Sequence, residues 1–230
     1  MNREEQLLQN FKEVQDSLSG ACKRAGREPQ EITLLGVTKY AADEDVLFLL
    51  KRGLLKHVGE SRLQQALSRW TRPEFAAFDT VKHLIGHLQH NKAAKAAAFF
   101  DFIDSLDDLS TAEILDKHVP VEKALRVLVQ VKLTTRETQS GLPLEKAREL
   151  VRQVRSFTNL KVCGYMAIAP QGATPQELKA LFAPLKEAFD EDFPLGQERY
   201  LSLGMSEDFE IAIEAGSTLP RIGSKLFAER

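Results

Sequence analysis

The chain has few of the residues on which secreted, membrane-spanning or nucleic-acid-binding proteins depend. Only two of its 230 residues are cysteines, Cys22 and Cys163, which cannot form a disulfide framework and include no Cys-x-x-Cys pair. No apolar run approaches the ~18 residues that span a bilayer, and the N-terminus lacks the apolar core of a signal peptide. The net charge of −2 argues against dedicated binding to nucleic acid or to an anionic membrane. We therefore expect a cytoplasmic protein with neither kind of partner.

The glycine-rich fingerprints of nucleotide-binding folds are also absent. Neither Gly-x-Gly-x-x-Gly nor Gly-x-x-x-x-Gly-Lys follows any strand-like segment. The sequence has no Pro/Gly/Ser-rich linker, no internal repeat and no low-complexity tract. Its composition, with 43% hydrophobic and 28% charged residues, is ordinary for a globular protein. We predict that residues 1–230 form a single domain.

Helix-like and strand-like segments alternate along the chain. Residues 1–26 predict an N-terminal helix, with Leu7, Phe11, Val14 and Leu18 on one face and Gly26 as its stop. Strands are predicted at 33–38, 54–58, 81–85, 99–104, 126–133, 161–168, 200–203 and 219–222. Helices are predicted near 42–52, 61–70, 88–98, 107–117, 143–157, 174–191 and 206–215, with a last one opening after Gly223. About eight strand–helix units predict an α/β protein, a (β/α)8 TIM barrel on which the N-terminal helix packs as an extra element. An open doubly wound sheet has the same alternation and is the main rival.

Lys39 is the first candidate functional residue. It ends the apolar segment Leu34-Leu35-Gly36-Val37-Thr38, and chemistry in such barrels takes place at the C-terminal ends of the strands. A partly desolvated lysine amine can attack a carbonyl group and form a Schiff base. The ordinary alternative is a solvated surface lysine, because most lysines are exposed.

Two small-residue clusters predict an anion site. Ser202, Gly204 and Ser206 follow the seventh predicted strand, and Gly223-Ser224 follows the eighth. The loops after strands seven and eight commonly bind phosphate in barrels, through hydroxyl and backbone N–H groups. Two ordinary helix caps are the alternative interpretation.

Other polar clusters carry a weaker signal. His83, His87 and His90 could suggest a metal, but Gly86 interrupts their spacing and no cysteine lies nearby, so we interpret them as polar contacts. Four basic residues form a scatter rather than a stripe and are interpreted as solvated: Arg69, Arg72, Lys92 and Lys95.

Several motifs together resemble the pyridoxal phosphate homeostasis proteins (the YggS/PROSC family), which are related to the barrel domain of alanine racemase. The resemblance runs along almost the whole chain, through motifs that agree in order and spacing. They are LGVTK at 35–39, HVGESRLQ at 57–64, HLIGHLQHNK at 83–92, SLD at 105–107, GYMAI at 164–168, LSLGMSED at 201–208 and GSTLPRIGS at 216–224.

The resemblance implies pyridoxal 5′-phosphate (PLP) as the cofactor and a role for individual residues. Lys39 matches the lysine that forms the Schiff base, and Arg221 matches the arginine that faces the pyridine nitrogen. Such an arginine keeps that nitrogen unprotonated and weakens the ring as an electron sink, which suits a carrier better than a catalyst. The remaining matches surround the phosphate or the ring: Ser61, His83, Ile85, Met166, Ser202, Ser206, Gly223 and Ser224.

The sequence departs from the family pattern at a few positions. Ser61 stands where asparagine is usual and Ser224 where threonine is usual, and both can still donate a hydrogen bond. Gln139 stands where a lysine is frequent, which puts in doubt a role for that loop in relaying cofactor.

The resemblance therefore implies a monomeric, non-catalytic protein of vitamin B6 homeostasis that holds PLP on Lys39 and hands it to apo-enzymes. No metal is expected. A PLP-dependent racemase-like enzyme is the alternative, with Tyr165, which is predicted to border the mouth of the barrel, as the candidate second acid, although no appended domain supplies the usual tyrosine. A barrel that binds another small phosphate is the third possibility.

Overall fold

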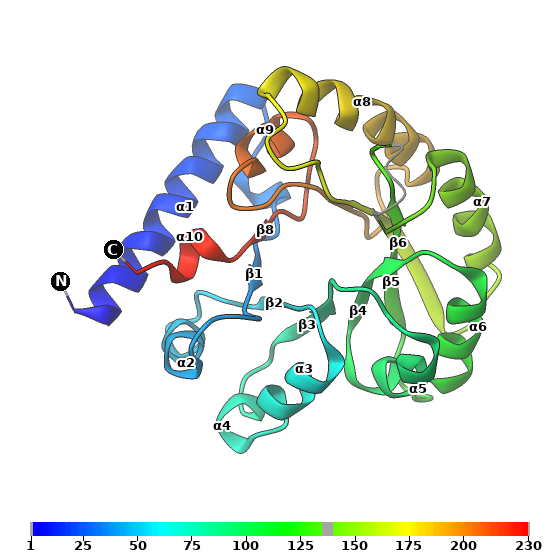
Figure 1. The fold of residues 1–230 in the computed structure, drawn as a ribbon, viewed down its shortest axis with the longest axis horizontal. Helices are drawn as coiled ribbons and strands as arrows, with labels where there is room; N and C mark the ends of the chain where they lie inside the picture. Colours follow the sequence, from blue (N-terminus) through cyan, green and yellow to red (C-terminus); the bar gives the residue numbers. More distant parts are fainter. Residues whose placement is uncertain (1, 135–139, 230) are drawn as a thin grey trace.

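Eight parallel strands form one sheet that curls into a barrel (Figure 1). The computed structural model describes residues 2–134 and 140–229. The strands are β1 Leu35–Val37, β2 His57–Glu60, β3 Val81–Leu84, β4 Phe102–Leu106, β5 Leu125–Val131, β6 Leu160–Ala167, β7 Tyr200–Ser202 and β8 Arg221–Ile222. They pair in the order β7-β6-β5-β4-β3-β2-β1-β8, and every pair is parallel. Each predicted strand is present.

Hydrogen bonds across the remaining seam close the barrel between β7 and the segment that leads into β8. The N–H groups of Thr218 and Leu219 donate to the carbonyl oxygen of Leu201 at 2.9 and 3.2 Å, and that of Arg221 donates to Gly204 at 3.0 Å. An open doubly wound sheet would leave both of these edges unpaired. The TIM-barrel prediction is therefore confirmed.

Helices follow the strands and cover the outside of the barrel (Figure 1). They are α2 Asp43–Lys51, α3 Leu63–Trp70, α4 Pro73–Ala76, α5 His90–Phe99, α6 Leu109–His118, α7 Leu144–Val154, α8 Pro175–Asp192, α9 Phe209–Glu214 and α10 Ser224–Phe227. Two short elements, α4 and the 3-10 helix η1 (Pro29–Glu31), were not predicted. No helix in the described ranges is both long and apolar enough to cross a membrane.

The boundaries of β4 differ from the prediction at both ends. Phe99 is the last residue of α5, and the strand begins three residues later, at Phe102. Ala93, Ala96 and Ala97 are fully buried, so the apolar run belongs first to the inner face of the helix and then to the strand. Such a run does not by itself distinguish the end of a buried helix from the start of a buried strand.

The N-terminal helix α1 (Arg3–Ala25) lies against α9 and α10 (Figure 1). It begins with a capping box between Asn2 and Glu5 and ends at Gly26, whose φ of 65° is left-handed. Its buried face includes Leu7, Val14 and Leu18, as the spacing predicts. The first helix and the last helix are thereby held together.

Candidate functional site

A cavity of about 510 Å³ opens beside the C-terminal ends of β1, β3 and β8. Six of the predicted site residues line it: Lys39, Ile85, Ser206, Arg221, Gly223 and Ser224. Most of the remaining wall is apolar, with Val37, Met205 and Phe227 among its residues. An amine, a guanidinium and several small donors thus share one largely apolar space.

Lys39 lies in a turn that follows β1. The N–H group of Thr38 makes the next bond of the β1–β2 ladder, to the carbonyl of Gly59 at 3.1 Å. The N–H group of Ala41 donates to the carbonyl of Thr38 at 3.0 Å and closes the turn around Lys39 and Tyr40. The lysine Nζ lies 5.1 Å from the centre of the Tyr40 ring, which is 88% exposed. The half-buried lysine therefore stands between the cavity and solvent.

Arg221 contributes a fixed cation to the cavity wall. Its Nη1 donates to the carbonyl oxygen and the hydroxyl of Ser202 at 2.8 and 2.9 Å, and Nη2 donates to the carbonyl of Ala167 at 2.9 Å. Burial lowers the pKa of Arg221 to about 10, although the charges of Asp104 and Asp208 act in the opposite direction. A guanidinium with that pKa stays charged at neutral pH.

The loops after β7 and β8 bring several hydrogen-bond donors together. The Ser206 hydroxyl accepts from the N–H groups of Gly223 and Lys225, both at the long distance of 3.4 Å. Bonds this long are weak, so the Ser206 hydroxyl and these two N–H groups remain available to donate to a stronger acceptor. Gly204 has a φ of 86°, and a Cβ there would lie 2.6 Å from the Cβ of Ala212. This loop approaches α9 closely because residue 204 lacks a side chain.

The N-terminal helix fixes one wall of the cavity. Arg3 donates to the carbonyls of Ala228 and Phe227 at 3.1 and 2.9 Å, and both of these residues line the cavity. The Asn10 amide donates to the carbonyls of Leu226 and Ala228 at 3.1 Å each. Asn10 is buried, and these two hydrogen bonds explain why a polar residue lies on the inner face of α1.

Four predicted site residues lie elsewhere. Ser61 lines a neighbouring cavity with Arg62, His87 and Lys92. The Ser202 hydroxyl donates to the carbonyl of Leu219 at 3.0 Å and accepts from Arg221, so it supports the arginine from behind. His83 and Met166 are completely buried and do not line the cavity. Gln139, the departure noted in the sequence, lies outside the described residues.

His83 is the centre of a buried polar chain. Its Nδ1 lies 3.0 Å from Asp104 Oδ1, its Nε2 lies 3.0 Å from Nδ1 of His57, and its ring stacks on Phe102 at 4.1 Å. All partners are satisfied when His83 donates from Nδ1 to Asp104 and His57 donates from Nδ1 to His83. Burial, followed by the charges of His83, Lys56 and Arg126, lowers the pKa of His57 to about 4. Among the described residues no group of three or more His, Cys, Asp or Glu is arranged to hold a metal.

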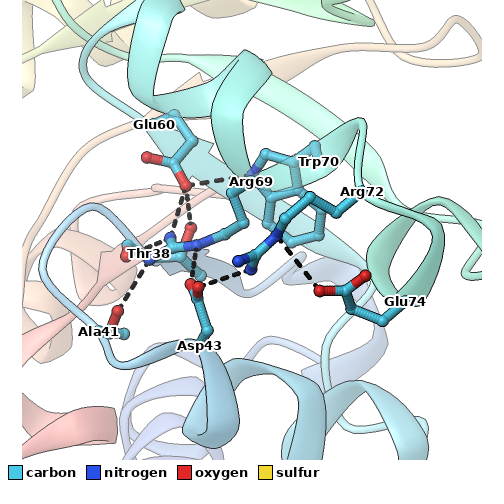
Figure 2. A network of polar contacts seen from close by, with 8 residues as sticks. All are labelled: Thr38, Ala41, Asp43, Glu60, Arg69, Trp70, Arg72 and Glu74. Atoms are coloured by element: carbon cyan, nitrogen blue, oxygen red, sulfur yellow. Dashed lines mark hydrogen bonds and ion pairs between the residues drawn. The ribbon is translucent and has the colours of Figure 1, made fainter.

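The prediction that Arg69 is a solvated basic residue is wrong. Its side chain is 14% exposed and pairs with Asp43 at 2.7 Å and Glu60 at 2.9 Å (Figure 2). Glu60 is itself 1% exposed. An acidic residue at the end of a buried strand was the available signal, because a buried carboxylate requires a cationic or hydrogen-bonding partner.

The prediction that Tyr165 borders the mouth of the barrel is also wrong. Tyr165 is completely buried, and its hydroxyl donates to Asp192 of α8 at 2.6 Å. Burial, together with that carboxylate, raises the pKa of Tyr165 well above its usual value. The ring faces the outer helix, and of the three tyrosines Tyr40 lines the cavity.

Comparison with known proteins agrees with the barrel fold. The sequence profile described as "Alanine racemase, N-terminal domain" matches residues 33–230. A pyridoxal phosphate homeostasis protein of Aquifex aeolicus is 35% identical over 223 residues, covering 94% of this chain and 95% of that protein. A protein of the same name from Escherichia coli is 33% identical over 233 residues, covering 97% of each. The structure of PipY from Synechococcus elongatus with PLP bound has a TM-score of 0.76 at 29% identity, covering 92% of this chain and 100% of that one.

Fold and profile define a barrel of the alanine racemase N-terminal type. Within that class, the chain belongs to the family of pyridoxal phosphate homeostasis proteins, as the sequence resemblance predicts.

Proposed function

We propose that the chain binds PLP in the 510 Å³ cavity, holds it covalently through Lys39 and serves as a carrier in vitamin B6 homeostasis. The observation that supports this proposal is the presence of Lys39, Arg221 and the Ser206–Gly223 donors in one cavity. PLP has an aldehyde, a pyridine ring and a phosphate, and each finds a complementary group here.

The residues divide the work among themselves. Lys39 would supply the amine that bonds to the PLP aldehyde, with loss of one molecule of water. Arg221, which hydrogen bonds to Ser202 and Ala167 immobilise, would face the pyridine nitrogen. Ser206, Gly223 and Ser224 would donate to the phosphate, and Ile85 would pack against the ring.

A carrier is favoured over an enzyme by the identity of the group at the pyridine nitrogen. A positively charged guanidinium beside that nitrogen disfavours its protonation. The unprotonated ring then withdraws electrons weakly. We propose that the bound cofactor is passed on to apo-enzymes that depend on PLP. The relatives are named for homeostasis rather than for a reaction, which supports the same view.

The absorption spectrum of the purified protein tests the proposal directly. PLP should give a visible band that borohydride removes, and peptide mapping should then find a pyridoxyl group on Lys39. Lys39→Ala should abolish the label. A wild-type protein that stays colourless and unlabelled with excess PLP would refute covalent binding. Transfer of PLP from the protein to an apo-aminotransferase tests the carrier role.

The racemase-like alternative has a different candidate acid from the one predicted. Tyr40 lines the cavity beside Lys39, whereas Tyr165 does not reach it. A racemisation assay on the wild type and on Tyr40→Phe separates the two functions. Turnover that depends on Tyr40 would establish an enzyme, and its absence in a PLP-loaded protein supports the carrier.

A further inference from the structure

Arg69 spans the turn that carries Lys39 (Figure 2). Its Nη1 donates to the carbonyl oxygen of Thr38 at 2.7 Å, and its Nη2 donates to that of Ala41 at 2.8 Å. These carbonyls belong to the first and last residues of the turn. One guanidinium therefore fixes both ends of the segment in which Lys39 lies.

Two carboxylates hold Arg69 in turn. Glu60 Oε1 accepts from Arg69 at 2.9 Å, from the Thr38 hydroxyl at 2.7 Å and from the Trp70 indole at 3.1 Å. Asp43 accepts from Arg69 Nε at 2.7 Å. Burial alone would raise the pKa of Asp43, but its bonds to Arg69 and Arg72 outweigh burial and lower it. Displacing Arg69 would leave the buried Glu60 without its counter-charge, which is unfavourable.

Lys39 lies between two cavities. It lines the 510 Å³ cavity, and it also lines a separate cavity of about 370 Å³ whose wall includes Glu60, Arg69 and Arg72. The two carboxylates of the second cavity, Asp43 and Glu60, are already paired with Arg69 and Arg72. A turn free to rotate would let the lysine leave the first cavity for the second one.

We propose that Arg69 and Glu60 are positioning residues, which hold the Thr38–Ala41 turn so that the Lys39 amine meets its ligand in the 510 Å³ cavity. This inference rests on the proposed function of Lys39 as the point of attachment. Neither Arg69 nor Glu60 lines that cavity, so both act through the turn and not by contact with the ligand.

An arginine is required at position 69 because of its shape. Its planar fork delivers bonds to two carbonyls and two carboxylates at once, whereas a lysine ammonium is a single point charge. Arg69→Lys therefore keeps the charge beside Glu60 but releases one end of the turn. Arg72→Lys is the matched control, because Arg72 also pairs with Asp43 but donates to neither carbonyl of the turn.

Two ligands distinguish a role in positioning Lys39 from a general loss of structure in the binding site. PLP binds covalently, whereas pyridoxine 5′-phosphate has an alcohol in place of the aldehyde and binds without a bond to Lys39. Arg69→Lys should weaken PLP binding by about tenfold, since small misplacements of a reacting group have effects of this size or larger. Its affinity for pyridoxine 5′-phosphate should stay within about twofold of the wild type, because the remaining contacts are unchanged. Arg72→Lys should change neither.

The outcomes are distinguishable. Equal PLP affinity in Arg69→Lys and the wild type, or a parallel loss of both ligands, overturns the positioning role and leaves the proposed function intact. A wild type that binds pyridoxine 5′-phosphate as tightly as PLP refutes the proposed attachment itself. Should Arg69→Lys not fold, Glu60→Gln decides, because it keeps the side-chain volume and should show the same selective loss of PLP affinity.

Discussion

Arg221 and Ser202 are joined twice, through the carbonyl oxygen of Ser202 at 2.8 Å and through its hydroxyl at 2.9 Å. The serine therefore orients a buried cation from the side opposite to the cavity. This relationship gives Ser202 a role different from the phosphate contact that the sequence resemblance implies.

Ser202→Ala should destabilise the fold. It removes a hydrogen bond to a buried charged group, for which a loss of about 1.5–3 kcal/mol in the free energy of unfolding is expected. Urea unfolding followed by circular dichroism measures it. Ser68→Ala, at an exposed position of α3, is the control and should stay within about 0.5 kcal/mol of the wild type. Equal effects of the two substitutions would contradict the supporting role of Ser202.

Ser206→Ala should weaken binding of the phosphate-bearing ligand. It removes one hydrogen-bond donor from the loops after β7 and β8, which corresponds to roughly a three- to tenfold higher Kd for pyridoxine 5′-phosphate. Isothermal titration calorimetry checks this. Ser61→Ala, in the neighbouring cavity, should leave the Kd unchanged. A loss of affinity in Ser61→Ala would show that both cavities contribute to one site.

Gly204→Ala should be far more damaging than the same change at Gly172. Both glycines have left-handed φ values, 86° and 77°, which cost an alanine about 1 kcal/mol. A Cβ at position 204 also meets Phe209 Cα at 2.7 Å and Ala212 Cβ at 2.6 Å, whereas nothing lies within 4 Å of one at 172. Overpacking of this kind adds about 1–3 kcal/mol, so the difference between the two variants isolates the close contact. Equal melting temperatures would mean that the loop relaxes without strain.

The buried histidine chain should make stability depend on pH. The pKa of His57 is about 4 in the folded protein against 6.5 for the free group, so the unfolded chain binds more protons between these values. Stability is therefore expected to fall as the pH decreases from 6.5 to 4, by roughly 1–2 kcal/mol for a half-buried ring.

Denaturant midpoints measured across that range test this expectation. In His57→Gln the decline should be shallower, because glutamine does not titrate. The charges that act on His57 come from His83, Lys56, Arg126 and Asp101. If the wild type and the variant show the same decline in stability, the decline belongs to titratable groups other than His57.

The strand–helix alternation and the strand-end residues were visible in the sequence, and the orientation of individual side chains was not. Tyr165 is predicted at the mouth and Met166 beside the cofactor ring, but neighbouring residues of a strand point to opposite faces. Met166 packs against Leu35 and Leu128 inside the barrel, and Tyr165 points out to α8. Applying the two-residue period to this strand would have excluded one of the pair.

The environment of Arg69 is hidden from the sequence for a different reason. Its partners lie 9, 26 and 31 residues away along the chain, in Glu60, Asp43 and Thr38. Local charge patterning contains no information about such pairs, because they form only when α3 packs beside the turn after β1. Ser61 shows the same limit, since one residue beyond a strand the direction of a loop is set by tertiary contacts.

The closure of the barrel has a consequence for the time at which the chain can acquire its ligand. Lys39 follows the first strand, whereas the guanidinium and part of the anion loops come from residues 221–224, which are held in place by Arg3 and Asn10 through the segment that follows them. A nascent chain still on the ribosome presents Lys39 early but lacks the cavity that Lys39 lines in the folded barrel. The attachment of PLP that we propose is thereby postponed until synthesis has passed residue 228 and the two ends of the fold have met.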